Sequence, residues 1–400
     1  MSQIEFRAFV DDDLKDVGPM MATSFSCKEE EVLEWHKRVG KENVRVALMK
    51  NRPAASLVLI NMGIWLGGKS VSTLGVQGVA TAPEFRGRGV CRAMMRETIR
   101  EAHAKGTSLS ALYASTFRLY RSVGYEFSGG FYNAEVPLNL FPRSRDFEGL
   151  TLRRMSEKDH DGIAQCYTIR ARTRAGMLDR DSVLWDRVYA PRGKTVEGWI
   201  FTNAENLVEG YLIYSVERQG NDLGVIYTLH DVSACTARGW RGLAGFLRSL
   251  YSMLGQARWN CGPGDPLLSL LPERGSALKW EEDWMLRVVN IESALCARGW
   301  SSALQGEVHF RFSDDVIDDN NGRFVLTVDK GRVSVKAGGD GRLCMDINGL
   351  APLYTGCQSA EELQMSGLIS GADKSVADDE SLAMATALFA GPTPSMPDMF

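Results

Sequence analysis

The sequence has little of what marks metal, disulfide or membrane proteins. Its eight cysteines are scattered without CxxC pairs, and its five histidines show no metal-ligand spacing. No apolar run reaches the roughly 18 residues that a membrane span needs. The first residues also lack the basic and apolar regions of a secretory signal. We therefore expect free thiols, no metal site, no membrane contact and a cytoplasmic location.

An excess of positive charge is also missing. The 46 Lys and Arg residues are outnumbered by 50 Asp and Glu, which gives a net charge of −4 at pH 7. This balance argues against nucleic acid as a partner, so any anion site must be local. The 400 residues, 44% of them hydrophobic, are enough for two or three folded domains.

The hydrophobic pattern predicts three α/β or α+β domains. Strand-like alternation at 4–9, 44–50, 54–65 and 70–81, with helices between, predicts a first domain over 1–143. The same order then returns as a weak repeat over 144–290, with a helix expected at 238–255. Short strands, a helix and a Pro-rich end predict a third, α+β domain over 291–400.

A basic, glycine-spaced turn, EFRGRGVCRAMM at 84–95, joins the strand at 70–81 to a helix. Glycines let the backbone approach a ligand, and the N-terminus of a helix attracts anions. Two arginines add charged donors, so a pyrophosphate fits this turn. A nucleotide-binding P-loop is disfavoured, because no GK[ST] follows.

These residues resemble the coenzyme A loop of the GNAT acyltransferases, and FRLYRSVGYEF at 117–127 resembles the GNAT segment that carries a catalytic tyrosine. The resemblance implies that Tyr120 protonates the thiolate that leaves coenzyme A. It also implies that the main chain of the preceding strand aligns the cofactor, acetyl-CoA. The cofactor-binding residues implied in this way are Val79, Ala80, Thr81, Arg86, Gly87, Arg88, Gly89, Val90, Cys91 and Ser115.

Over essentially its full length the chain resembles the enhanced-intracellular-survival (Eis) family of GNAT N-acetyltransferases. The motifs VATAPEFRGRGVCRAM, LYASTFRLYRSVGY, DPLLSLLP and WMLRVVNIESALCARGW occur in the expected order, and the printed sequence ends in Phe400. The family implies two tandem GNAT-like domains, the second degenerate, followed by a sterol-carrier-like domain. That last domain would deliver the carboxylate of Phe400 as general base, while Phe25 and Trp35 would line the pocket for a primary amine.

Some residues depart from the family. Cys27 and Met399 stand where relatives carry acidic side chains, so an aminoglycoside or polyamine would find fewer anchors than a simpler amine. Transfer of a longer acyl group to a peptide or natural-product amine, or a non-catalytic scaffold that binds coenzyme A, stays open. Arg238 and Arg241 of the second domain echo the basic turn, but we expect a structural role there. A homo-oligomer, a hexamer in relatives, is implied by the resemblance alone.

Overall fold

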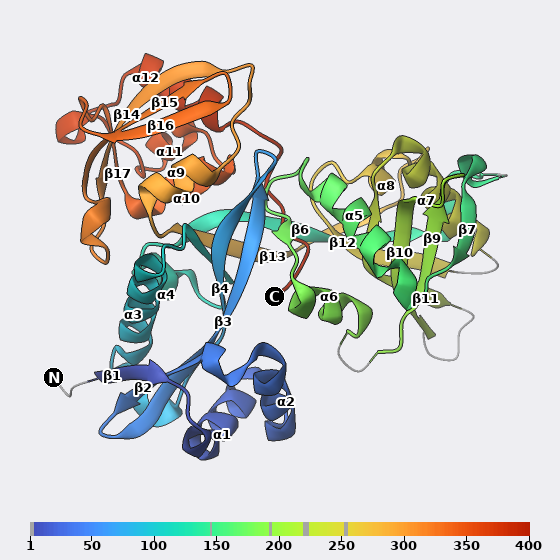
Figure 1. The fold of residues 1–400 in the computed structure, drawn as a ribbon, viewed down its shortest axis with the longest axis horizontal. Helices are drawn as coiled ribbons and strands as arrows, with labels where there is room; N and C mark the ends of the chain where they lie inside the picture. The colour runs from blue at the N-terminus through green and yellow to red at the C-terminus, as the bar shows by residue number, and fades with distance from the viewer. Residues whose placement is uncertain (1–3, 145, 192–193, 219–223, 252–254) are drawn as a thin grey trace. The chain divides into compact units, whose positions relative to one another are not determined.

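The computed structural model describes residues 4–144, 146–191, 194–218, 224–251 and 255–400 (Figure 1). The chain divides into two compact units. The first consists of Met1–Gly129, Asp283–Pro392 and Phe400, and the second of Gly130–Glu282 and Thr393–Met399.

The first unit contains a mixed sheet that begins with four antiparallel strands and continues with one parallel strand. Trp284–Val288 of β13 then pairs antiparallel with β5, after a gap in sequence of about 170 residues. The strand order is β1 (Ile4–Ala8), β2 (Val44–Met49), β3 (Arg52–Leu66), β4 (Lys69–Thr81), β5 (Leu109–Tyr113) and β13 (Ala277–Val288). The strands predicted for the first domain are confirmed, and β3 and β4 form the long hairpin seen in Figure 1.

The helices of this sheet bury one apolar face each. In α3 (Val90–Ala104) the residues Val90, Met94, Ile99 and Ala102 recur at helical spacing and are all buried. They join a core that also receives Val17 and Met20 of α1. The other helices of this part are α1 (Leu14–Phe25), α2 (Glu29–Val39) and the short α4 (Phe117–Arg121).

The first unit also holds a separate four-stranded sheet with helices packed around it. Its strand order is β16 (Arg332–Ala337), β15 (Gly322–Asp329), β14 (Gln305–Ser313) and β17 (Leu343–Asp346). The accompanying helices are α9 (Ile291–Ala297), α10 (Ile347–Thr355), α11 (Ala360–Met365) and α12 (Asp379–Phe389). The α+β character predicted after residue 291 is confirmed.

The second unit repeats the plan of the first sheet. Its strand order is β6 (Glu126–Pro137), β12 (Gly255–Cys261), β11 (Val225–Ala234), β10 (Val208–Arg218), β9 (Glu197–Thr202) and β7 (Thr151–Arg154). Its helices are α5 (His160–Ala171), α6 (Ser182–Tyr189), α7 (Ala237–Ser249) and α8 (Pro266–Ser269). The helix predicted at 238–255 was too long, because α7 ends at Ser249 and Gly255 opens β12.

The repeat extends to side chains. Arg7 of β1 forms a two-pronged ion pair with Asp13, with N–O distances of 2.7 and 2.8 Å. Arg153 of β7 does the same with Asp159, at 2.9 and 2.6 Å. In both cases the aspartate also accepts a hydrogen bond from the main-chain N–H three residues earlier. The two copies therefore retain the same connection between first strand and first helix.

Two further features concern membrane-spanning helices and the state of the cysteines. Among the described residues, no helix is long and apolar enough to cross a membrane. The eight cysteines are all free thiols.

Candidate active site

The candidate site begins where β4 and β5 part. Their parallel pairing covers only Thr73–Gly75 of β4, opposite Leu109–Ala111 of β5. Beyond it, Ala80 and Thr81 still pair with β3 on their other side, after a bulge beside Gly78, whose φ is +59°. Within the described chain the β5-facing edge of Val79–Thr81 pairs with no strand, and the contact recorded on it is the Arg86 side chain at the Thr81 carbonyl.

The basic turn follows directly. Gly87 and Gly89 have φ values of +72° and +77°, and a Cβ at either position would meet nothing within 4 Å. The glycines are thus required by backbone conformation and not by crowding. Gly89 is the N-cap of α3 and contributes no side chain, so the first N–H groups of the helix stay uncapped. Consecutive main-chain donors at the positive end of a helix suit a phosphate group.

The side chains of the turn differ in burial, because the two arginines are exposed and Val90 and Cys91 are more buried. Arg86 and Arg88 are exposed; the Nε of Arg86 donates to the Thr81 carbonyl at 3.3 Å, and Arg88 lies 6.0 Å from the Phe85 ring. In the described structure neither arginine has a carboxylate partner. Val90 is buried in the core, so only its main chain faces the turn. Burial raises the pKa of the Cys91 thiol, which stays neutral.

Tyr120 lies on α4 and is 4% exposed. Its ring meets that of Tyr125 edge-on at 6.1 Å. Burial raises the pKa of Tyr120 well above its usual value near 10, and a hydrogen bond with exposed Ser115 opposes this shift only in part. The phenol therefore keeps its proton at every working pH. Tyr125 is fully buried, and its hydroxyl lies 2.7 Å from that of Ser110.

Phe400 belongs to the first unit and is only 6% exposed. Its ring lies 5.5 Å from that of Tyr113, at the end of β5. A Cβ added to Gly75 would stand 2.9 Å from the Phe400 ring, so the ring packs against bare backbone where the two strands part. The sequence analysis did not identify Gly75 or Tyr113 as part of the site. The signal for Gly75 was available, because a glycine inside a strand often marks a place where another group approaches the backbone closely.

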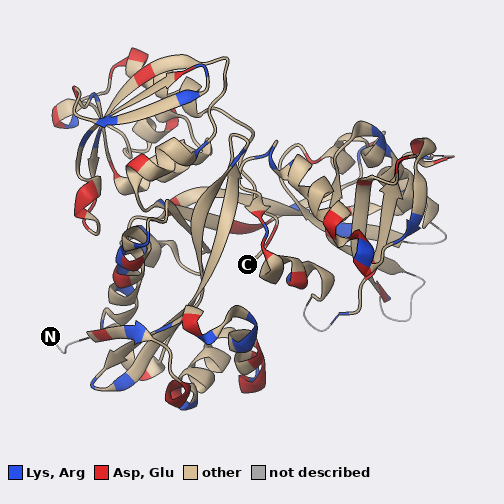
Figure 2. Ribbon diagram, viewed as in Figure 1, with Lys and Arg blue, Asp and Glu red and all other residues tan. Residues whose placement is uncertain are grey.

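The two aromatic residues predicted for the amine pocket lie on neighbouring helices. Phe25 ends α1 and is half exposed, and Trp35 of α2 is partly buried against the first core. The first turn of α2 carries Glu29, Glu30 and Glu31, while its last turn is basic (Figure 2). Asp398, in the second unit, forms an ion pair at 2.6 Å with the buried Arg180 and so is already engaged.

The corresponding helix start in the second unit is closed. The Thr236 hydroxyl caps α7 by accepting a hydrogen bond from the Gly239 N–H at 3.1 Å. Arg238 is paired with the buried carboxylate of Glu209, whose pKa it holds below the usual range. Arg241 is likewise paired, with Glu148 at 2.8 Å. These contacts fit the structural role expected for the second turn.

Comparison with known proteins agrees with the fold. Two family models described as "Acetyltransferase (GNAT) domain" match residues 5–128 and 176–288, and a "Sterol carrier protein domain" model matches 291–397. The forked sheet, the glycine-built turn and these matches define an acyltransferase, and the chain belongs to the GNAT N-acetyltransferases.

Within that family the chain is a homologue of the Eis enzymes. The "N-acetyltransferase Eis" of Mycobacterium tuberculosis is 29% identical over 303 residues, or 73% of this chain and 72% of that protein. A GCN5-related N-acetyltransferase from Anabaena variabilis matches over 100% of both chains, with a TM-score of 0.93 and 29% identity. Eis1 from Mycobacterium abscessus also matches over 100% of both chains, with a TM-score of 0.80 and 19% identity, and so shares the fold.

Proposed function

We propose that this protein transfers an acetyl group from acetyl-CoA directly to a primary amine of a small molecule, with no covalent enzyme intermediate. The observation that carries the proposal is the uncapped, glycine-built start of α3 beside the open edge of β4. It offers a diphosphate main-chain donors and two arginines that have no carboxylate partner in the described structure. The described residues of the second unit offer no equivalent, because the start of α7 is capped and its arginines are paired, so one acetyl-CoA site per chain is proposed.

The residues present fit the cofactor. Arg86–Cys91 would hold the pyrophosphate through main-chain N–H groups, with Arg86 and Arg88 adding charge. Val79, Ala80 and Thr81 would bind the pantetheine arm through their main chain and align the thioester carbonyl. Bound acetyl-CoA supplies the activated acetyl group and a thiol leaving group. Ser115 would contribute by fixing the Tyr120 hydroxyl, since the two side chains are hydrogen bonded.

Tyr120 is the proposed general acid. Its raised pKa keeps the phenol protonated, as a proton donor to the leaving sulfur requires. The α-carboxylate of Phe400 is the proposed general base, which accepts a proton from the attacking amine directly or through one water. The burial of the Phe400 ring supports this role, because a carboxylate held away from water is a stronger base than one in solution.

The amine would lie against Phe25 and Trp35. Cys27 and Met399 add no charge at two positions where relatives carry acidic side chains. The lack of added charge favours a substrate with a single amino group, bound against the apolar side chains of Phe25 and Trp35. It disfavours broad activity on aminoglycosides or polyamines. It also supports the alternative that the enzyme transfers a longer acyl group to a peptide or natural-product amine. The relationship to Eis further suggests a homo-oligomer, a hexamer, which light scattering would measure.

The test is release of thiol from acetyl-CoA in the presence of polyamines, aminoglycosides, lysine peptides and simple monoamines. With the best amine, Tyr120→Phe should lower kcat by about 10²- to 10⁴-fold, the usual contribution of a general acid. Tyr354→Phe is the matched control, because that buried phenol bonds to the Ala294 carbonyl, away from the site. Equal activity of the two variants would remove Tyr120 from the mechanism.

The base is tested in two ways. Deleting Phe400 removes both its ring and its carboxylate, and adding one glycine after Phe400 keeps the ring but moves the carboxylate. Both changes should lower kcat by at least about 10²-fold if the carboxylate takes the proton. Full activity of the extended chain would show that the Phe400 ring only packs and that its carboxylate takes no part in proton transfer.

A further inference from the structure

The proposed acid, Tyr120, is followed at once by a tight turn that must hold it in place. The N–H of Tyr125 donates to the carbonyl of Tyr120 at 3.1 Å, and Gly124 has a φ of +89°. Residues 121–125 thus reverse the chain between α4 and β6. Because α4 has only five residues, it has little internal support, and the position of Tyr120 depends on what packs against this turn.

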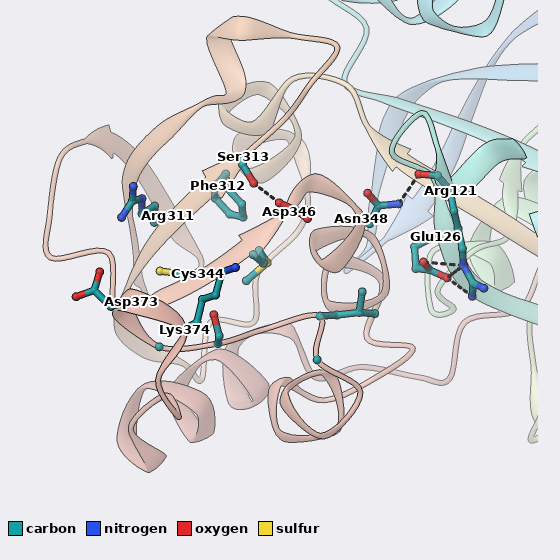
Figure 3. Close-up of a pocket in the computed structure, with 15 residues that line it drawn as sticks. Arg121, Glu126, Arg311, Phe312, Ser313, Cys344, Asp346, Asn348, Asp373 and Lys374 are labelled. Carbon is teal, nitrogen blue, oxygen red and sulfur yellow. Dashed lines mark hydrogen bonds and ion pairs between the residues drawn. The ribbon is translucent and has the colours of Figure 1, made fainter. Parts of the chain in front are cut away.

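Asn348, near the start of α10 in the sterol-carrier-like domain, reaches both ends of the turn. Its Nδ2 donates to the carbonyl of Arg121 at 3.0 Å and to the carbonyl of Tyr125 at 2.9 Å. An amide NH₂ has two hydrogens, and here both are used on main-chain atoms four residues apart. Figure 3 shows Asn348 pointing from α10 toward Arg121.

The turn is also supported by Arg287, which lies on β13 of the first sheet. A Cβ at Gly124 would lie 1.5 Å from Nη1 of Arg287, so the guanidinium occupies the space that a side chain there would need. Arg287 is fully buried, and its Nη2 donates to both carboxylate oxygens of Asp314, at 2.7 and 2.8 Å. Asp314 follows β14 of the sterol-carrier-like domain, so this ion pair fixes the domain under the turn.

A third contact joins the two ends of the turn through an ion pair between side chains. The Nε of Arg121 donates to both carboxylate oxygens of Glu126 at 2.9 Å. Arg121, Glu126 and Asn348 line one end of a cavity of about 880 Å³ that also reaches β14, β17 and Lys374 (Figure 3). Solvent therefore has access to this side of the turn, and the hydrogen bonds of Asn348 must hold it against competing water.

We propose that the sterol-carrier-like domain braces the catalytic turn, and that Asn348 is a positioning residue for the Tyr120 phenol. This inference rests on the proposed function, since it gives Asn348 a role in catalysis only through Tyr120. Loss of the amide would let the turn relax and move the hydroxyl away from the leaving sulfur. A displacement of about 1 Å can cost about 10²-fold in rate.

The experiment compares Asn348→Ala, alone and combined with Tyr120→Phe, in the acetyl-CoA thiol-release assay on the full chain. Asn348→Ala should lower kcat by about 10-fold or more, while the dissociation constant of acetyl-CoA changes less than about 2-fold. In the Tyr120→Phe background the same substitution should cause no further loss, because residues that act through one group are not additive. Asn348→Asp keeps the shape of the side chain without its donors and should give the same result.

Thr355→Val is the matched control. Thr355 lies on the same helix, and its hydroxyl has three carbonyl acceptors within reach, those of Ala351 and Pro352 in its own helix at 3.3 Å and that of Ser128 in β6 at 3.4 Å; none belongs to residues 121–125. It should lower thermal stability without changing kcat of the folded enzyme. If Thr355→Val lowers kcat as much as Asn348→Ala does, or if the Asn348 and Tyr120 effects add, Asn348 only stabilises the fold and the inference is overturned.

The remaining outcomes separate the two proposals. If Tyr120→Phe is impaired and both folded Asn348 variants have wild-type kcat, the brace is wrong and the proposed acid stands. If Tyr120→Phe is fully active, the proposed acid is wrong, and the brace is overturned with it whatever the Asn348 variants do.

Discussion

The starts of helices α3 and α7 are the same element in two copies of one fold, yet one is open and the other is closed. In the first copy the cap is a glycine, and the two arginines of the turn have no carboxylate partner in the described structure. In the second copy a threonine caps the helix, and Arg238 and Arg241 are each paired with a glutamate. The difference teaches that two copies can share the GNAT shape although one helix start is open and the other is closed by its own side chains.

The proposed acid differs in the same way. After β5, the first copy has the short helix α4 with a buried Tyr120. After β12, the second copy has the short helix α8, whose buried residue is Leu267. What both copies retain is structural, namely the paired Arg7 and Asp13 in one and Arg153 and Asp159 in the other. Scaffold contacts thus persist where the residues proposed to bind the cofactor do not.

We expect the largest effect, on the KM for acetyl-CoA, from replacing the two arginines of the open turn. Replacing Arg86 and Arg88 together by alanine should raise the KM for acetyl-CoA by about 10²-fold or more, since each charged hydrogen bond to phosphate contributes about 1.5–3 kcal/mol. Replacing Arg238 and Arg241 together should leave this KM unchanged. Initial rates at varied acetyl-CoA measure both, and similar KM values for the two double variants would break the distinction between the open and closed turns.

We expect an intermediate effect, on stability, from removing the glutamate that pairs with Arg238 at the start of α7. Glu209→Gln removes the charge that pairs with Arg238, and we expect it to lower the free energy of unfolding by about 1–2 kcal/mol, because the carboxylate is buried but the arginine is half exposed. Thermal unfolding measures the loss. Calorimetric titration should find one acetyl-CoA per chain in the variant as in the parent protein. A second bound acetyl-CoA would mean that Glu209 alone had blocked a working site.

The smallest effect concerns what the copies share. Asp13→Asn and Asp159→Asn should each lower the free energy of unfolding by about 1 kcal/mol at pH 7 and leave the KM for acetyl-CoA unchanged. The partner arginine lowers the pKa of each carboxyl, to about 2 for Asp159. A lowered pKa stabilises the fold above the unfolded value near 3.8, and this contribution is lost as pH falls from about 4 toward 2. Unfolding by urea across that pH range should therefore show the variants converging on the parent protein, and a constant difference would contradict this account.

Local patterns in the sequence were enough to predict the elements around the site. Alternation at 70–81, the glycine-spaced turn and the helical spacing of Val90, Met94 and Ile99 gave the strand, turn and helix that the structure has. These features depend on neighbours within a few residues, which a sequence records directly. The end of α7 was misjudged because apolar residues continue past Ser249 into β12, and periodicity does not mark that change.

Long-range contacts could not be predicted. No residue near Gly124 in the sequence indicates that Arg287 fills the space where a side chain at position 124 would lie. Likewise, no residue near Tyr120 in the sequence indicates that Asn348 bonds to the turn that follows it. Such pairs are joined only by the folded sheet, over separations of more than 150 residues. The roles of Tyr120, Phe400 and the cofactor-binding residues, and the domain boundaries at 143 and 290, stay predictions.

One feature of the first sheet bears on how the protein could be divided. Its last strand, Trp284–Val288 of β13, is supplied only after the whole second copy has been made. A fragment that stopped near residue 143 would leave β5 with an unpaired hydrogen-bonding edge, and exposed strand edges recruit other chains. Shortened versions of the catalytic copy should therefore aggregate during expression, and ribosomal synthesis must pass residue 288 before that copy can close its sheet.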